Sequence, residues 1–191
     1  MRPVLTVILL IGSLVSAWAT TLRKLSIDDM IQQSTAIVRV KVTGSSAAFR
    51  GKDIYTSYQL QVIENMKSAS ASNLTQSLAV AVPGGAAGGV RQMVAGAPVL
   101  ASGQEYVIFL WTSKSGLTQV IGLSQGLFAV TQNSTGAAVI VRPASISMML
   151  NQSGQVVTDQ PVSMTLTALR SEIQSVLGSV NASGSANGGA N

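Results

Sequence analysis

Hydrophobic and polar residues alternate in two stretches of the first half of the chain. In residues 36–42 every second residue from position 38 is a valine, and Arg39 and Lys41 lie between the valines. A later stretch places Tyr58 and Leu60 on one side and glutamines on the other. Because successive side chains of a strand point to opposite faces, each stretch predicts a half-buried strand.

Polar and small residues separate these strands from their neighbours. We expect a loop through residues 44–53 between the two strands and a mobile Ser/Ala/Asn-rich connection over residues 67–77. A third strand is expected over residues 78–82, and Pro83 ends it.

The run from Glu105 to Trp111 is hydrophobic without alternation. A strand of this kind has both faces covered. Shorter strands are expected at about 117–121, 126–131 and 138–142, separated by glycine-containing turns.

Two helices are expected, one near each end. Ser26 and Asp29 form a capping-box pattern, which predicts a helix from Ile27 to about Gln33. Hydrophobic residues at helical spacing predict a second, amphipathic helix from 165 to 177, with Gly178 as its C-cap. The fold class is therefore mainly β (α+β), a small barrel or sandwich with a short N-terminal helix and a C-terminal helix.

The first 19 residues have the three parts of a secretory signal peptide. A short basic start precedes a hydrophobic run over residues 4–15, and small residues at 17 and 19 suit cleavage between Ala19 and Thr20. The hydrophobic run is too short for a stable membrane anchor. We therefore expect a secreted or periplasmic protein with one β-rich domain over 20–178 and a disordered Gly/Ser/Ala/Asn tail over 179–191.

The amino-acid composition limits the kinds of chemistry that the chain can perform. The chain contains no cysteine and no histidine, so it lacks disulfides and the side chains most used for metal binding, nucleophile activation and proton transfer near neutral pH. Its net charge is +5, but the basic residues are scattered rather than clustered. This argues against nucleic-acid binding. We expect no cofactor and no metal.

A glycine-rich segment follows the third strand and is the candidate binding site. Its glycines could turn backbone N–H groups toward one point, and Arg91 could add a positive charge for an anion. The alternative is a wide flexible hairpin or bulged turn between two strands, which we favour. The candidate residues are Gly84, Gly85, Gly88, Gly89 and Arg91.

The sequence contains no complete catalytic motif. Residues 122–126 match Gly-x-Ser-x-Gly, but that motif needs a histidine base and a strand–turn–helix context. The chain has only seven acidic residues, and no spacing among them indicates a hydrolytic pair. Asp53 with Asp159 is one conceivable pair.

Several segments resemble an uncharacterised family of secreted bacterial proteins, over about residues 25–130. They are Val82-Pro83-Gly84-Gly85, Gly103-Gln104-Glu105-Tyr106-Val107-Ile108-Phe109-Leu110 and Gln125-Gly126-Leu127-Phe128-Ala129-Val130. More distantly, the order of strands around the glycine-rich loop is similar to OB-like barrels of the netrin and metalloproteinase-inhibitor kind. That resemblance implies a five-stranded Greek-key barrel with helices at its ends. Those inhibitors bind the protease zinc through an N-terminal cysteine, where this chain would have Thr20.

The sequence thus predicts an exported, non-catalytic binding domain whose partner is an envelope or extracellular protein. The first alternative is an inhibitor or accessory protein of an extracytoplasmic protease. The second is a hydrolase that uses acidic residues alone.

Overall fold

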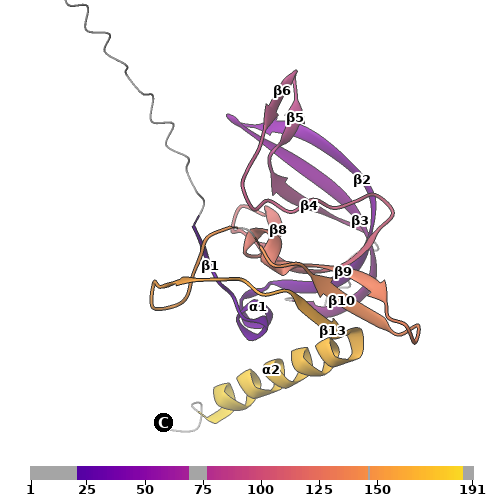
Figure 1. Ribbon diagram of the computed structural model, residues 1–191, viewed down its shortest axis with the longest axis vertical. Coiled ribbons are helices and arrows are strands. Elements are labelled where there is room, and N and C mark those ends of the chain that lie inside the picture. Colours follow the sequence, from indigo (N-terminus) through magenta and orange to yellow (C-terminus); the bar gives the residue numbers. More distant parts are fainter. Residues whose placement is uncertain (1–20, 69–76, 146, 187–191) are drawn as a thin grey trace, which may run out of the picture.

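The computed structural model describes residues 21–68, 77–145 and 147–186 (Figure 1). The expected signal peptide with its Ala19–Thr20 cleavage site, most of the expected 67–77 connection, and residues 187–191 lie outside the described residues. Strands dominate the described part, and a helix lies near each end of it. The expected mainly β fold with a short N-terminal and a C-terminal helix is confirmed.

The elements follow one another along the chain in this order. The N-terminal half holds β1 (Leu22–Arg23), α1 (Ile27–Gln33), β2 (Ala36–Arg50), β3 (Asp53–Ser68), β4 (Ser77–Pro83), β5 (Gly85–Ala87) and β6 (Val90–Gln92). The C-terminal half holds β7 (Glu105–Thr112), β8 (Thr118–Val120), a short 3-10 helix (Leu123–Gly126), β9 (Leu127–Gln132), β10 (Ala138–Arg142), β11 (Met149–Leu150), β12 (Val156–Val157), β13 (Val162–Thr165) and α2 (Leu166–Ala186).

One large sheet organises the molecule, with strand order β13-β10-β9-β7-β2-β3-β4. β8 and β9 pair with the same edge of β7. β9 pairs with residues 106–108 of β7, and β8 pairs with residues 110–112. β8 lies against β4 but does not pair with it, so the sheet is not closed into a barrel among the described residues. Two small sheets complete the fold, β1-β11-β12 and β5-β6.

The sheet separates two hydrophobic cores, and β7 contributes to both. Tyr106, Ile108 and Leu110 belong to the inner core, on the concave side between β2, β3, β4 and β7. Val107 and Phe109 belong to the outer core, beneath α1 and α2. This explains the absence of alternation in β7, because both of its faces are buried as expected.

The two helices are held on the outer core by specific contacts. Ser26 and Asp29 form the expected capping box, and α1 has the predicted bounds. The ammonium group of Lys67 donates to the carbonyl oxygens of Ile31 and Gln32, which caps the end of α1. The guanidinium of Arg170 in α2 holds the Glu64 carboxylate of β3 at 2.7 and 2.8 Å.

Two expected boundaries are wrong. Residues 44–53 do not form a loop, because β2 and β3 continue as a long hairpin that turns at Gly51 and Lys52. Much of this extension is exposed, and backbone pairing maintains it without the hydrophobic pattern of a buried strand. The C-terminal helix does not end at Gly178 but continues to Ala186, into the segment predicted as a disordered tail. A glycine weakens a helix by only about 1 kcal/mol and need not end it.

Candidate binding site

The glycine-rich segment forms a tight β-hairpin. β5 and β6 pair in antiparallel register, and the two residues between them, Gly88 and Gly89, have φ angles of 57° and 75°. A two-residue loop of this type requires positive φ at both positions, which glycine adopts without strain. The segment is therefore a hairpin, as favoured from the sequence, but a tight one rather than the wide flexible one expected. It lies at the end of the molecule farthest from α2 (Figure 1).

This hairpin is fixed against the β2–β3 hairpin by close packing. Gly85 has φ of +137°, and a Cβ atom there would lie 2.5 Å from the Thr56 hydroxyl oxygen and 3.0 Å from the Ala47 Cβ. The glycine thus allows the two hairpins to approach each other directly.

Hydrogen bonds fix the same position. The Gly84 N–H donates to the Ile54 carbonyl oxygen at 2.7 Å, and the Gly84 carbonyl accepts from Thr56 at 2.8 Å. The Gln92 side chain accepts from the Ile54 N–H at 2.6 Å and donates to Asp53 at 3.3 Å. The Gly84 N–H is therefore not available as an anion donor.

A cleft of about 310 Å³ lies between this hairpin, the inner core and the segment that follows β6. The side chains that surround it are mainly apolar, and Arg91 is the charged residue among the described residues that line it. The lining residues are Thr56, Tyr58, Val82, Pro83, Gly84, Gly85, Arg91, Gln92, Met93, Val94, Ala97, Pro98 and Val99.

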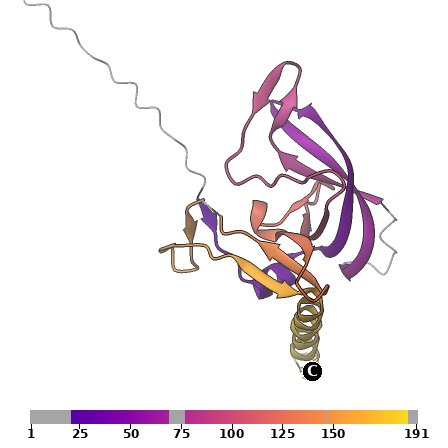
Figure 2. The ribbon, with the colours of Figure 1, turned by 45° about the vertical axis from the view of Figure 1, so that its right-hand side comes forward.

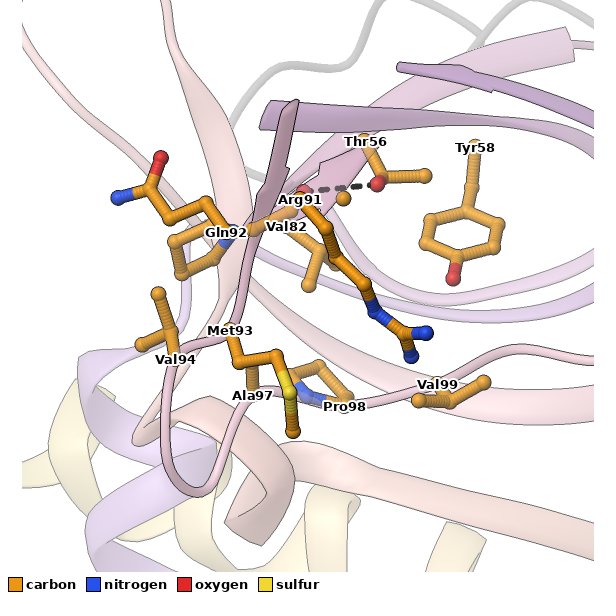
Figure 3. A pocket seen from close by; sticks show the side chains of 13 residues that line it. Thr56, Tyr58, Val82, Arg91, Gln92, Met93, Val94, Ala97, Pro98 and Val99 are labelled. Atoms are coloured by element: carbon orange, nitrogen blue, oxygen red, sulfur yellow. Dashed lines mark hydrogen bonds between the residues drawn. The ribbon is translucent and has the colours of Figure 1, made fainter. Parts of the chain in front are cut away.

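Arg91 and Tyr58 are the notable polar groups of this cleft. Figure 3 shows the Arg91 guanidinium and the Tyr58 hydroxyl turned toward the same side of it, near Val99. The Tyr58 residue is 8% exposed and belongs to the inner core, whereas Arg91 is exposed. Within the described part of the chain, neither side chain has a hydrogen-bond or ion-pair partner.

The structure brings together three of the five predicted site residues. Gly84, Gly85 and Arg91 line the cleft, while Gly88 and Gly89 form the exposed tip of the hairpin and do not. Sequence reasoning missed Tyr58 and the opposite wall over residues 93–99. Tyr58 has the pattern of an ordinary core residue, but the exposure of Met93 (82%) and Val99 (79%) is unusual for hydrophobic side chains.

The acid pair considered from the sequence is not supported. Asp53 accepts from Gln92, whereas Asp159 forms a buried ion pair with Arg142 at 2.5 Å and also accepts from the Ser145 N–H. Burial alone would raise the pKa of Asp159, but the hydrogen bonds from Arg142 and Ser145 outweigh it and leave this pKa below its usual value. Such a carboxylate is held ionised by the fold rather than prepared to donate a proton.

The Gly-x-Ser-x-Gly segment also has a structural explanation. It lies between β8 and β9 as the short 3-10 helix, in the strand–turn–strand context expected. Its buried Gln125 accepts from the Leu25 N–H at 2.8 Å and donates to the Arg23 carbonyl at 2.9 Å. The segment thus attaches the N-terminal residues to the sheet.

The described residues contain no cluster of three acidic, histidine or cysteine side chains suitable for a metal ion. None of their helices has the length and hydrophobicity required to cross a membrane.

Two comparisons with known proteins find no match for this chain. No known family matches its sequence, and a search of curated proteins finds no significant match.

Proposed function

We propose that this chain is an exported, non-catalytic binding domain, and that an envelope or extracellular protein docks on the cleft beneath the β5–β6 hairpin. The observation that carries the proposal is the mouth of the cleft, where Met93 and Val99 are largely exposed beside Arg91, which has no partner among the described residues. Exposed hydrophobic side chains around a polar anchor are typical of protein-binding surfaces.

Export is part of the proposal, and it rests on the signal-peptide pattern of residues 1–19. We expect cleavage between Ala19 and Thr20, so N-terminal sequencing of protein recovered from the culture medium or periplasm should begin at Thr20. Recovery of that material with Met1 retained would contradict this expectation.

An OB-like architecture is the finer fold proposal. Five strands follow one another in the order β4-β3-β2-β7-β8, which is the neighbour order of an OB barrel, and β8 approaches β4 across the remaining gap. This order favours the resemblance to netrin and metalloproteinase-inhibitor barrels, whereas the proposed resemblance to a family of secreted bacterial proteins rests on sequence segments alone. It also keeps an inhibitor or accessory protein of an extracytoplasmic protease as the second candidate function.

Site-specific cross-linking tests the proposal. Because the chain has no cysteine, Val99→Cys introduces a unique thiol at the cleft, to which a photo-reactive group can be attached. Val156→Cys, at an exposed valine of β12, provides the matched control. We expect position 99 to cross-link one envelope or extracellular protein that position 156 does not, and the purified pair to bind in solution.

Equal cross-linking from both positions, or none from position 99, would refute docking at the cleft. If the cross-linked protein is a protease, its activity with and without this domain separates the two candidate functions. A loss of proteolysis on complex formation would favour the inhibitor.

A further inference from the structure

The charges around the cleft define what it can bind. Arg91 brings one positive charge, and no acidic residue is among the described residues that line the cleft. One ligand with one negative charge would therefore neutralise the site. The planar guanidinium also matches the two oxygens of a carboxylate, with which it forms paired hydrogen bonds.

Tyr58 adds a second donor on the same side of the cleft. Its ring packs with the inner core, so the hydroxyl is carried by a rigid side chain and is not bound to another described residue. Unlike the Nε of Arg142, this hydroxyl is not fully shielded from solvent, so a ligand acceptor would exchange solvent for a direct hydrogen bond. An acceptor held by Arg91 would lie on the side to which the hydroxyl turns (Figure 3).

The remaining walls select the group attached to that acceptor. Val82, Val94, Ala97 and Pro98 present apolar surface to the cleft, with Met93 and Val99 at its mouth. A strongly hydrated dianion would lose its water against these walls without enough donors to replace it. A carboxylate next to hydrophobic groups would leave only its charged end to be paired.

The arginine is presented by a backbone that is already in place. Arg91 pairs with Ala86 across the β5–β6 hairpin, and the adjacent Gln92 binds the Ile54 N–H. Binding therefore needs to order the Arg91 side chain but not the hairpin.

We propose that the cleft recognises a carboxylate flanked by apolar groups, with the carboxylate held by Arg91 and Tyr58. This inference rests on the proposed binding function and names the chemistry of the partner segment. The carboxylate could be the C-terminus of a chain or an acidic side chain within one, and the two sources give the same contacts.

Short peptides measured by NMR titration of the complete mature domain test this chemistry. The first pair is acetyl-Val-Val with a free carboxyl terminus and its C-terminal amide. The second pair is acetyl-Val-Glu-Val amide and its glutamine counterpart. We expect at least one carboxylate peptide to shift the resonances of cleft residues and to bind about tenfold or more tightly than its neutral match.

Three variants assign the contacts. Arg91→Gln should weaken binding of the carboxylate peptide by about tenfold or more, and Tyr58→Phe by about three- to tenfold. Arg50→Gln makes the same charge change at an exposed residue of the neighbouring hairpin, outside the cleft lining, and should leave the affinity within about twofold. Unchanged chemical shifts away from the cleft will show that the variants remain folded.

The outcomes separate this inference from the proposed function. Binding of acid and neutral peptides with equal affinity, binding of neither pair, equal weakening by Arg50→Gln and Arg91→Gln, or displacement of the carboxylate peptide by an equimolar amount of inorganic phosphate would each overturn carboxylate recognition. Cross-linking from position 99 would remain informative in every one of those cases, because it reports docking whatever the chemistry of the ligand. Loss of that cross-linking alone would refute the docking site instead.

Discussion

The two faces of the large sheet differ in how their hydrophobic cores are covered. The outer core is covered by α1 and α2, and Phe109 and Phe128 pack there at 5.5 Å between ring centroids with no exposure to solvent. The inner core is enclosed by the curvature of the sheet and ends at the cleft, where Val82 and Tyr58 form part of its wall. Figure 2 shows α2 seen along its axis at one end of the molecule and the β5–β6 hairpin at the other.

This difference separates the residues needed for stability from those needed for binding. A core covered by helices has all its hydrophobic surface buried, so its residues are constrained by packing alone. A core that ends at an open cleft keeps some hydrophobic and polar groups available to a ligand. We therefore expect substitutions on the helix side to change stability and substitutions at the cleft to change binding.

The largest effect should come from the outer core. Phe109→Ala removes a fully buried ring from the centre of β7 and should lower the free energy of unfolding by about 3–5 kcal/mol. Trp111→Ala in the same strand, where the side chain is 44% exposed, should cost clearly less. Urea denaturation measures both, and equal midpoints for the two variants would show that the helix-covered core is not the stabilising one.

A smaller effect is expected where the hairpin contacts the β2–β3 extension. Gly85→Ala introduces a Cβ at a positive φ and within 2.5 Å of the Thr56 oxygen, and should cost about 1–3 kcal/mol. Hydrogen exchange should show the loss in the β5–β6 hairpin before the outer core, because local opening relieves the clash. The matched change Gly178→Ala, in α2 with open space around it, should stabilise by up to about 1 kcal/mol.

The contact between the two helices gives a pH-dependent prediction. Burial, then the neighbouring Asp28 carboxyl, raise the pKa of Glu172 above its usual value. The folded state therefore binds this proton more tightly than the unfolded state, and the stabilisation is complete below the unfolded pKa and lost as pH rises through the raised value. Glu172→Gln should stabilise the protein at pH 7 by about 0.5–1 kcal/mol, and the gain should disappear at pH 3.

Thermal melts at both pH values check this sign. A Glu172→Gln variant that is less stable than the wild type at pH 7 would contradict it. Glu64→Gln serves as the opposing control. The Arg170 guanidinium lowers the pKa of Glu64, so removal of its charge should destabilise at pH 7.

The smallest effect is expected at the hairpin itself. Ala86-Ala87→Ser-Ser changes small residues near the tip while the paired backbone and Arg91 remain. We expect the melting temperature and partner binding to stay unchanged, as for a loop that only presents a neighbouring residue. A loss of binding with an unaltered circular dichroism melt would move the site from the cleft to the hairpin tip.

The sequence predicted the elements that carry a local signal, such as a helix cap or a continuous hydrophobic run. The Ser26–Asp29 capping box located α1, and the unbroken hydrophobic run located β7 with both faces covered. The β2–β3 extension was missed because small and polar residues line much of it, so backbone pairing leaves no hydrophobic pattern. The short strands β11, β12 and β13 have too few residues to show alternation, and β11 also depends on a distant partner, β1.

The candidate site was predictable in the same partial way. Glycine-rich composition indicated the hairpin, and Arg91 was the charge beside it. The opposite wall could not be inferred, because residues 93–99 lie across the cleft only after β5 and β6 fold against β3. Tyr58 was predicted to face inward, which is correct, but no sequence pattern distinguishes an inward tyrosine with a satisfied hydroxyl from one without.

The amide of Gln125 has a consequence for the order in which the molecule assembles. Its hydrogen bonds to Leu25 and Arg23 join positions 100 and 102 residues apart in the chain. The Gln125 side chain is correctly placed for them only once the turn between β8 and β9 has formed. Closing so long a segment carries an entropic cost that local hairpins avoid. We therefore expect the first residues of the described chain to become attached late in folding, after the local hairpins have formed.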